Sequence, residues 1–355
     1  MPRYEVHGAT STDERELLEL ARHLNTVNLP NSRAHVVRLL DHSARSFAGE
    51  LPPAERKFVF VLRDVERGRA VGTSTLVAQL GRRDAPYIYL DVIREEKYSR
   101  RLDRHFRHKL LRIGFSYDGP TELAGLVVDP EYRRAPERLG LVIACVRFLY
   151  VAMHRALFQD QLLAELLPPL EPDGTSHLWE AFGRRFTQLD YAEADLLSSE
   201  DKTFISDLFP NGVVHASLFS PEAQNVIGKV GHQTLGVEKM LRRVGFRYAD
   251  RIDPFDGGPH FVAETGEVTL VKCSRRVRLG GVLDTPEPDS SLLVGRDLEA
   301  APYFRAAIAT HTRCSAGELE LPAAVLDQLG VSRGDEVFTL PLGARRQQSG
   351  APAPV

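Results

Sequence analysis

The sequence predicts a mixed α+β fold, in which a mixed sheet is flanked by helices. Three observations predict it: an amphipathic helical pattern near the start of the chain, several short apolar runs rich in β-branched and aromatic residues, and one long helical pattern near the middle. These segments follow the order helix, helix, three strands, helix, strand, helix, strand. Such an order is typical of a sheet covered by helices and differs from that of a helical bundle or an all-β sandwich.

The predicted helices rest on apolar residues spaced three and four apart. Residues 12–21 open with Thr12 as an N-cap residue, followed by early acids and a stripe of leucines. The same periodicity predicts helices at 32–47, about 137–158 and 176–182. Residues 237–246 repeat the pattern of 178–186, a helix followed by glycine and an aromatic residue, which favours a duplicated second lobe.

Strands are predicted where apolar residues run without a break. They are 58–62, 70–80, 121–128 and 162–167, of which the first two form a hairpin connected by 64–69. Two more extended pieces, 246–253 and 261–271, flank a turn at 256–259 (DGGP). Residues 81–120 alternate short extended pieces with basic residues, so we treat them as an excursion or an edge of the sheet.

The length of 355 residues predicts about two domains. We expect an N-terminal lobe over 1–200, a second lobe over 201–283, a linker and a small β-rich element over 284–346, and a disordered tail over 347–355. The linker prediction covers 284–300, where prolines and polar residues interrupt the apolar pattern.

Charge and composition exclude several classes of function. Lys plus Arg (45) nearly balances Asp plus Glu (48), so no overall field attracts nucleic acid or an anionic membrane. No signal segment or long apolar span is present, which predicts a cytoplasmic protein. The three cysteines fit neither a disulfide framework nor a zinc site, and arginines beside His105 and His108 disfavour a metal there, so no metal is predicted.

The most informative unit is the strand, basic loop and helix at 121–158. The backbone of Leu126, Val127 and Val128 ends a strand, and the amides of the following helix N-terminus can hold phosphate groups. The loop adds three cations and a glycine: Arg133, Arg134, Arg138 and Gly140. From the pattern alone, this unit is either a cofactor site or a strand followed by a solvated basic turn.

The segment 126–134 (LVVDPEYRR), followed by a helix, resembles the CoA-binding segment of the GNAT superfamily of acyl-CoA N-acyltransferases. More specifically, the chain resembles the arginine N-succinyltransferase family in a series of motifs that occur in the family's order. These motifs are GELP at 49–52, FVFVL at 58–62, EL at 122–123 with DPE at 129–131, RF at 147–148, GRRF at 183–186 with AD at 194–195, FI at 204–205, EAQ at 222–224 with VIG at 226–228, GFRY at 245–248, and Asp253 with FDGGP at 255–259.

The resemblance implies a GNAT-like fold with a second GNAT-like lobe, succinyl-CoA as co-substrate and the α-amine of L-arginine as acceptor. The product would be N2-succinyl-L-arginine, in the succinyltransferase route of arginine catabolism. The family's contact to succinyl-CoA falls on Leu126. We expect small-molecule substrates, no nucleic acid or membrane partner, and a homo-oligomer. The alternatives are the same transfer onto ornithine or another amine, a different acyl-CoA, or a non-catalytic protein that only binds these ligands.

Two motifs depart from the family. Its proton donor is the histidine of a VHPQT stretch, which here reads VGHQT at 230–234, so Gly231 aligns with the donor and His232 follows one residue later. We predict His232 as the catalytic acid, provided that it lies in a loop or at a helix start, because in a strand a one-residue shift turns the side chain to the opposite face. The phosphate loop also lacks the family's glycines apart from Gly140, so pyrophosphate binding depends more on the three arginines.

A guanidinium group pairs best with a carboxylate. Asp253 and Asp256 are the candidates for this role, and a plain hairpin turn is the competing interpretation of their segment. A third possibility concerns 319–337, whose rhythm resembles swapped-hairpin transcription regulators. Arg333 is the one basic residue there, so a small closing β-rich element is preferred over a DNA-binding module.

Overall fold

One sheet runs through the computed structural model, which describes residues 2–23, 29, 31–83, 85–171, 173–198, 202–283, 291–315 and 317–342. The strands are β1 Tyr4–Gly8, β2 Lys57–Asp64, β3 Arg69–Val77, β4 Tyr87–Ser99, β5 Arg104–Ser116, β6 Thr121–Val128, β7 Gln161–Glu165, β8 Val214–His215, β9 Arg247–Ile252, β10 Pro259–Glu264, β11 Arg275–Val282, β12 Leu292–Asp297, β13 Phe304–Ala309, β14 Arg313–Ser315, β15 Glu318–Leu321 and β16 Glu336–Pro341. Their order in the sheet is β14-β15-β11-β16-β12-β13-β1-β2-β3-β6-β7-β10-β9-β4-β5-β8.

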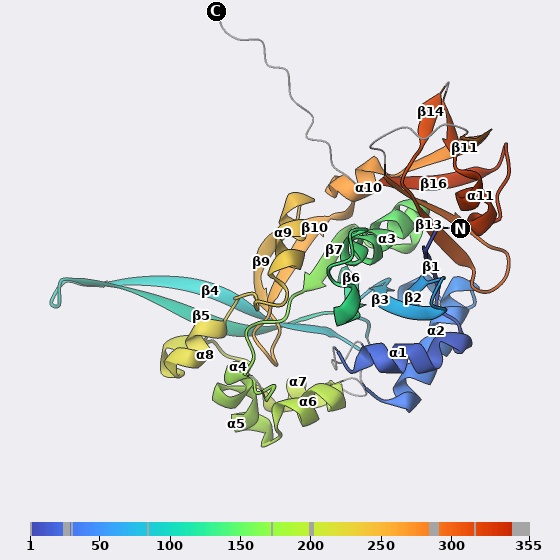
Figure 1. Ribbon diagram of the computed structural model, residues 1–355. Coiled ribbons are helices and arrows are strands. Elements are labelled where there is room, and N and C mark those ends of the chain that lie inside the picture. Colours follow the sequence, from blue (N-terminus) through green and yellow to red (C-terminus); the bar gives the residue numbers. More distant parts are fainter. Residues whose placement is uncertain are drawn as a thin grey trace, which may run out of the picture.

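Helices lie on both faces of this sheet (Figure 1). They are α1 Glu14–Ala21, α2 Arg33–Phe47, α3 Leu139–Met153, α4 His177–Ala181, α5 Gly183–Thr187, α6 Tyr191–Ser198, α7 Thr203–Leu208, α8 Pro221–Val226, α9 Leu235–Arg243, α10 Thr269–Cys273 and α11 Ala323–Leu329. Within the sheet, β6 with β7 and β11 with β15 are parallel pairs, and the other pairs are antiparallel. The predicted mixed sheet flanked by helices is therefore confirmed.

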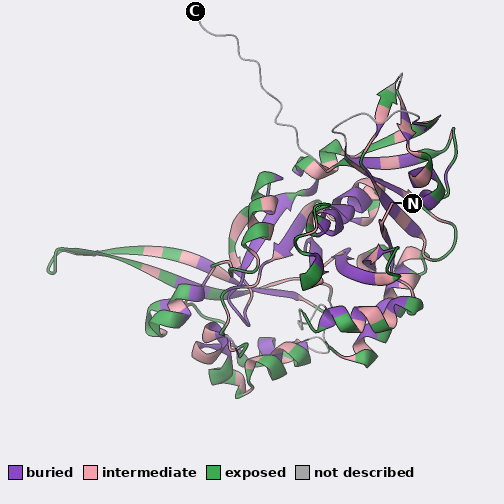
Figure 2. Cartoon of the chain, viewed as in Figure 1, coloured by how far each residue is buried: buried purple, intermediate pink, exposed green. Residues whose placement is uncertain are grey.

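Residues 58–62 of strand β2 are all apolar because both faces of the strand are covered. Phe58 and Phe60 point toward α3, which is almost wholly buried, whereas Val59 and Val61 point toward α1 and α2. Figure 2 shows α3 as a buried core helix between the sheet and the surrounding elements. This alternation of side chains, with a period of two, places the main core on the α3 face and a smaller one under α1 and α2.

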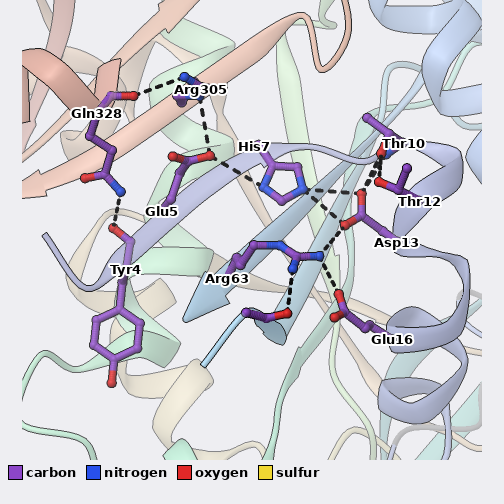
Figure 3. Close-up of polar contacts among 11 residues, drawn as sticks. Tyr4, Glu5, His7, Thr10, Thr12, Asp13, Glu16, Arg63, Arg305 and Gln328 are labelled. Carbon is purple, nitrogen blue, oxygen red and sulfur yellow. Dashed lines mark hydrogen bonds and ion pairs between the residues drawn. The ribbon is translucent and has the colours of Figure 1, made fainter. Parts of the chain in front are cut away.

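The N-terminal strand is fixed to α1 by a buried polar network (Figure 3). His7 Nε2 lies 3.2 Å from Asp13 Oδ1, and Arg63 Nη2 donates to the same oxygen at 3.1 Å. Burial raises the pKa of Asp13, but the hydrogen bond and charge of His7, the amide of Thr10 and the hydrogen bond of Arg63 together outweigh it and lower that pKa to about 2. Asp13 is therefore a buried, ionised anchor.

Residues 81–120, which we treated as an excursion or an edge, mostly form a long hairpin. Strands β4 and β5 pair residue by residue from Tyr87–Ser116 to Ser99–Arg104. In Figure 1 their outer part projects from the body as an arm, and in Figure 2 its tip is exposed. The inner part is anchored by Leu90 and Leu111, which pack among the side chains of the α4–α8 region.

The prediction that 237–246 repeat the structure of 178–186 is wrong. After α9, Gly245 takes a positive φ of 112° and the chain enters strand β9, whereas Gly183 opens helix α5 against the ring of Trp179. Strand pairing also crosses the predicted lobe boundaries, because β7 pairs with β10 and β11 pairs with both β15 and β16. The division into lobes stays a prediction.

Two predictions from the second half of the chain need correction. The extended piece 261–271 ends at Glu264, because a turn at Thr265–Glu267 leads into α10. Within the predicted linker, 292–297 form β12, which pairs in register with β13 and β16. Residues 284–290 and the predicted tail 347–355 lie outside the described residues. The small β-rich element near the C-terminus is confirmed by β12 to β16 with α11.

Among the described helices, none has the length and apolar character that a membrane crossing needs.

Candidate active site

The central feature of the site is the divergence of two parallel strands. Within the described residues, β6 and β7 pair only at Thr121–Leu162 and Glu122–Leu163, and then separate. The other edge of β6 remains paired with β3 up to Val128. The edge of β6 that faces β7 is therefore left without a strand partner over 123–128. This stretch includes residues 126–128, whose backbone the sequence predicts to pair with the cofactor.

A β-bulge lies within this stretch. Thr73 pairs with Val127 and Thr75 with Ala124, so Gly125 and Leu126 together lie opposite Ser74. Gly125 has a φ of 55°, a conformation that favours glycine. The bulge turns the Leu126 side chain into a cavity, while the Val127 and Val128 side chains remain in the core. Leu126 is the one of these three whose side chain lines the cavity.

A donor cavity of about 150 Å³ occupies the space between the separated strands. Leu123 to Leu126 line it from β6, and Ala164 to Leu167 line it from β7 and the residues that follow. Thr234 and Val237 contribute from the start of α9.

An acceptor cavity of about 260 Å³ adjoins the donor cavity. Its walls include Lys57, Tyr87 and Lys202. The two cavities share four residues, and all four are acidic: Glu122, Glu165, Asp195 and Asp253. The junction between the cavities is therefore lined by carboxyl groups.

The turn between β9 and β10 places both predicted aspartates at the site. Asp253 Oδ1 accepts the backbone N–H of Phe255 at 2.7 Å and of Asp256 at 3.1 Å, and Asp256 Oδ1 accepts that of Gly258 at 2.7 Å. Both side chains line the donor cavity, and Asp253 also lines the acceptor cavity. Burial raises the pKa of both carboxyls, and Asp253 raises that of Asp256 further. The segment is thus a hairpin turn that also lines the cavities.

Glu165, His260 and Tyr87 form a connected group that the sequence did not reveal. Glu165 ends β7 and lies directly opposite His260 on β10. His260 Nε2 is 3.4 Å from Glu165 Oε1, and His260 Nδ1 is 2.6 Å from the Tyr87 hydroxyl. His260 is fully buried, whereas the Glu165 side chain keeps 29% of its surface exposed, toward the cavities.

The electrostatics of this group follow from burial. Burial lowers the pKa of His260 to about 3, with a further contribution from Arg251, so the ring is neutral. Burial also raises the pKa of Tyr87, so its hydroxyl stays protonated and donates to Nδ1. The ring proton must then sit on Nε2, facing Glu165. Burial and the neighbouring charges of Glu122 and Asp253 raise the pKa of Glu165 well above its usual value.

The same region has the donor atoms of a metal site. One ligand atom from each of Glu165, Asp253 and His260 lies within 4.8 Å of the others. However, His260 Nδ1 accepts from Tyr87, so Nε2 carries the ring proton and has no lone pair to offer a metal. Asp253 Oδ1 already accepts two backbone amides. The arrangement fits hydrogen bonding better than a metal centre.

A buried cation also lines the donor cavity. Arg147 on α3 has 2% of its surface exposed, and its guanidinium donates to the carbonyls of Ala144 and Ala124, each at 3.4 Å. Burial lowers its pKa to about 10, so it remains charged at neutral pH. The charge of Glu122 opposes this lowering. The sequence showed this residue only as part of a family motif.

The predicted proton donor lies in a turn. Residues 232–234 form a turn directly before α9, and the His232 side chain is exposed. Two hydrogen bonds fix this turn over Leu167: Gly231 N donates to the Leu167 carbonyl at 2.8 Å, and Thr234 Oγ1 donates to it at 3.1 Å. Leu167 and Thr234 line the donor cavity and His232 does not, so the exposed imidazole is not part of the cavity wall.

The glycine before it is sterically required. A Cβ at Gly231 would lie 2.6 Å from the Pro168 carbonyl oxygen and 3.0 Å from that of Leu167. A side chain fits at this position only if one backbone segment moves.

The predicted phosphate loop connects β6 to the N-terminus of α3. Asp129 caps its first turn by accepting from Glu131 N at 2.9 Å, and Arg133 folds back to donate to the Val128 carbonyl at 3.1 Å. Arg134, Arg138 and Gly140 are exposed, and Arg138 takes the left-handed conformation that begins the helix. The first amides of an α-helix lack partners within the helix, so they and the two exposed arginines remain available to an anion.

The comparisons with known proteins agree with this geometry. The sequence profile of the family described as "Arginine N-succinyltransferase beta subunit" matches residues 4–270. An arginine N-succinyltransferase of Escherichia coli O6:K15:H31 (strain 536 / UPEC) is 31% identical over 345 residues, covering 96% of this chain and 98% of the relative. One from Salmonella paratyphi B is 32% identical over 321 residues, covering 90% and 92%.

A solved structure supports the fold independently. The arginine/ornithine succinyltransferase subunit AI from Pseudomonas aeruginosa superimposes with a TM-score of 0.82 at 25% identity, covering 97% of this chain and 100% of that one. The diverging parallel strands, the bulge and the basic loop before α3 thus occur in a chain that matches acyltransferases over nearly its full length. This chain belongs to the arginine N-succinyltransferase family, whose members are CoA-dependent N-acyltransferases with a GNAT-like fold.

Proposed function

We propose that the protein transfers succinyl from succinyl-CoA to the α-amine of L-arginine, which gives N2-succinyl-L-arginine and CoA. The observation that carries this proposal is the junction of the two cavities. The donor cavity follows the edge of β6 that lacks a strand partner, which suits a cofactor that pairs with a strand. The acceptor cavity meets the donor cavity at four carboxyl groups, which suit an acceptor with two positive charges.

The donor half of the proposal follows from the ends of β6 and α3. Pantetheine amides pair with the backbone near Leu126, on the edge of β6 that lacks a strand partner, and the phosphates bind at the N-terminus of α3 beside Arg134 and Arg138. Arg147, the buried cation of the donor cavity, binds the terminal carboxylate of the succinyl group. A backbone N–H near Val128 stabilises the oxyanion of the thioester carbonyl.

The acceptor half uses the carboxyl groups at the junction. Arginine carries an α-ammonium and a guanidinium, and both need anionic partners. Asp253 and Asp256 bind one of these groups. His232 gives a proton to the departing thiolate, because its turn is fixed over Leu167.

The test is release of CoA thiol from succinyl-CoA, measured with each of a panel of amines. We expect continuous turnover with L-arginine, and no turnover with Nα-acetylarginine, whose α-nitrogen is blocked. Turnover with ornithine in preference to arginine would instead identify ornithine as the acceptor, an amine that also occurs in the name of the Pseudomonas aeruginosa protein. Calorimetric binding of succinyl-CoA without any turnover would identify the protein as a non-catalytic sensor.

The proposal includes a homo-oligomer built through the arm. The arm exposes Tyr98, Leu102 and Phe106, and a two-stranded hairpin without further packing is marginally stable in water. Residues 94–107 hold six Lys or Arg against three Asp or Glu, while α6 carries exposed Glu193 near exposed Leu196 and Leu197. A second copy of this chain therefore offers both apolar and acidic complements to the arm.

Light scattering after size exclusion tests this contact. The double variant Tyr98→Ser with Phe106→Ser should reduce the mass to that of one chain, while Tyr117→Ser, an exposed tyrosine beyond the end of β5, should leave it unchanged. A monomeric parent protein, or no effect of the double variant, would contradict the arm contact. As a metabolic enzyme that uses CoA, the protein is proposed to act in the cytoplasm without a nucleic-acid or membrane partner.

A further inference from the structure

We infer that Glu165 is the general base that removes a proton from the α-ammonium of the acceptor, and that His260 and Tyr87 hold it in place. The inference rests on the proposed function, because it concerns the amine that the proposed reaction consumes. It assigns a role to three residues that neither the sequence pattern nor the family's proton donor accounts for.

The first step is the location of the base. The α-amine must meet the thioester where the two cavities join, so the base must be one of the four shared acids. Asp253 is occupied, since one of its oxygens accepts two backbone amides. Glu122 and Asp195 each take part in other polar interactions. Glu165, by contrast, lies beside the neutral ring of His260, and its side chain keeps exposed surface toward the cavities.

The second step is the group behind Glu165. His260 is fully buried, and its Nε2 is a polar atom with no hydrogen-bond partner among the described residues, although it points at Glu165 from 3.4 Å. Tyr87 fixes the ring through the 2.6 Å contact to Nδ1. An unpaired buried N–H is costly, and it forms its bond when the carboxylate moves slightly toward it. Tyr87 and His260 are thus positioning residues for Glu165, whose pKa is raised toward the range useful for a base.

Charges face Glu165 from every side of its pocket. Glu122 faces it from β6, Asp253 and Asp256 from the β9–β10 turn, and Lys202 from the segment before α7, while His260 lies on β10. The three acids disfavour ionisation of Glu165 and Lys202 favours it. A cationic acceptor entering this pocket favours the carboxylate form, so binding of the substrate itself prepares the base.

The proton balance is complete without another reactant. Glu165 takes one proton from the ammonium, and the neutral amine attacks the thioester carbonyl carbon. The C–N bond forms, the C–S bond breaks, and the second nitrogen proton goes to the thiolate, with His232 as the proposed carrier. Glu165 then releases its proton to solvent through the acceptor cavity.

The experiment compares Glu165→Gln with the parent protein and with Glu264→Gln, an exposed acid at the far end of the same β7–β10 pair. We expect Glu165→Gln to lower kcat/KM for arginine by about 10² at neutral pH, to lose the acidic limb of the pH profile, and to leave the calorimetric affinity for succinyl-CoA unchanged. Its deficit should shrink as the pH rises toward the pKa of the α-ammonium of free arginine, because more of the amine is then neutral without help from a base. His260→Gln should lower kcat with a shifted acidic limb, and Glu165→Asp should recover part of the activity.

Three results would contradict the inference or its basis. A Glu165→Gln protein that keeps its activity and its acidic limb, or one whose deficit is the same at every pH, overturns the base assignment. Stoichiometric bound metal together with loss of parent activity in chelator would also overturn it, in favour of a metal role for Glu165, Asp253 and His260. An inactive parent protein would instead refute the proposed function, because no amine would then be consumed.

Discussion

His260 Nε2 lies 3.4 Å from Oε1 of Glu165, and the two residues are directly opposed in the register of β10 and β7. The histidine is neutral and fully buried, whereas in the unfolded chain it takes up a proton near its ordinary pKa of 6.5. This difference links the stability of the protein to pH, independently of catalysis.

The direction of this pH dependence of stability follows from the lowered pKa of His260. Between pH 6.5 and about 3 the unfolded state binds a proton that the folded state does not, so stability falls as the pH falls through this window. The slope reaches at most about 1.4 kcal/mol per pH unit. We expect His260→Gln to reduce this slope, measured by urea unfolding at several pH values. Parallel curves for the variant and the parent protein would show that His260 does not titrate as described.

His232 is predicted to protonate the leaving thiolate. His232→Ala should therefore lower kcat with arginine by about 10² and leave the affinity for succinyl-CoA nearly unchanged. His311, in the C-terminal β-rich element, provides a control through His311→Ala, which should have no effect on kcat. Full turnover in the His232 variant would remove this residue from the mechanism and leave the thiolate to be protonated by solvent.

Arg134 and Arg138 are predicted to bind the phosphates of the donor. The double variant Arg134→Ala with Arg138→Ala should raise KM for succinyl-CoA by about tenfold or more and change KM for arginine little. Arg133 is left intact, because its bond to the Val128 carbonyl supports the end of β6. The matched control is Arg15→Ala on α1, an exposed arginine on another helix. An equal rise in both constants would argue against a phosphate role.

Arg147 is predicted to select the dicarboxylic acyl group. Arg147→Met removes the cation and keeps an unbranched side chain, so the preference for succinyl-CoA over butyryl-CoA, measured as the ratio of kcat/KM, should fall about tenfold or more. Arg147→Lys should retain part of the preference. If kcat/KM falls equally for both acyl-CoA donors, Arg147 supports β6 through the Ala124 carbonyl and does not bind the acyl group.

Gly231 is predicted to be intolerant of any side chain. Gly231→Ala should lower the free energy of unfolding by about 1–3 kcal/mol, because its Cβ would meet the Pro168 carbonyl oxygen at 2.6 Å. Gly236→Ala on α9 is the control, since a Cβ at that position would have nothing within 4 Å and alanine favours a helix. Equal stability of the two variants would contradict the steric account.

Local patterns predicted the elements whose residues share one environment. The middle of strand β2 is apolar on both faces, and the expected strand 58–62 falls within it. Helix α2 carries a regular apolar stripe, and the expected helix 32–47 nearly coincides with it. The arm was not predicted, because β4 and β5 leave the core along their length and their outer residues lose the apolar alternation. Strand β12 was missed since its apolar residues, Leu292 to Val294, are surrounded by polar neighbours.

The candidate site was predictable where a motif is contiguous. Leu126, Asp253 and Asp256 line the cavities, as expected from a strand end and a turn. Glu165 and His260 were missed because they lie 95 positions apart and meet only through the β7–β10 register. A single acid at the end of an apolar strand is the one local signal, and it does not reveal its partner.

The close approach of Gly231 to the Pro168 carbonyl also couples two segments that lie far apart in the sequence. A mutation that placed histidine at position 231 would bring its Cβ into collision with the backbone of 167–168. The segment 167–168 would first have to retreat, and the hydrogen bond from Gly231 to Leu167 opposes that movement. Position 231 and the segment 167–168 are therefore coupled, so the free-energy changes of substitutions in the two segments should not add independently.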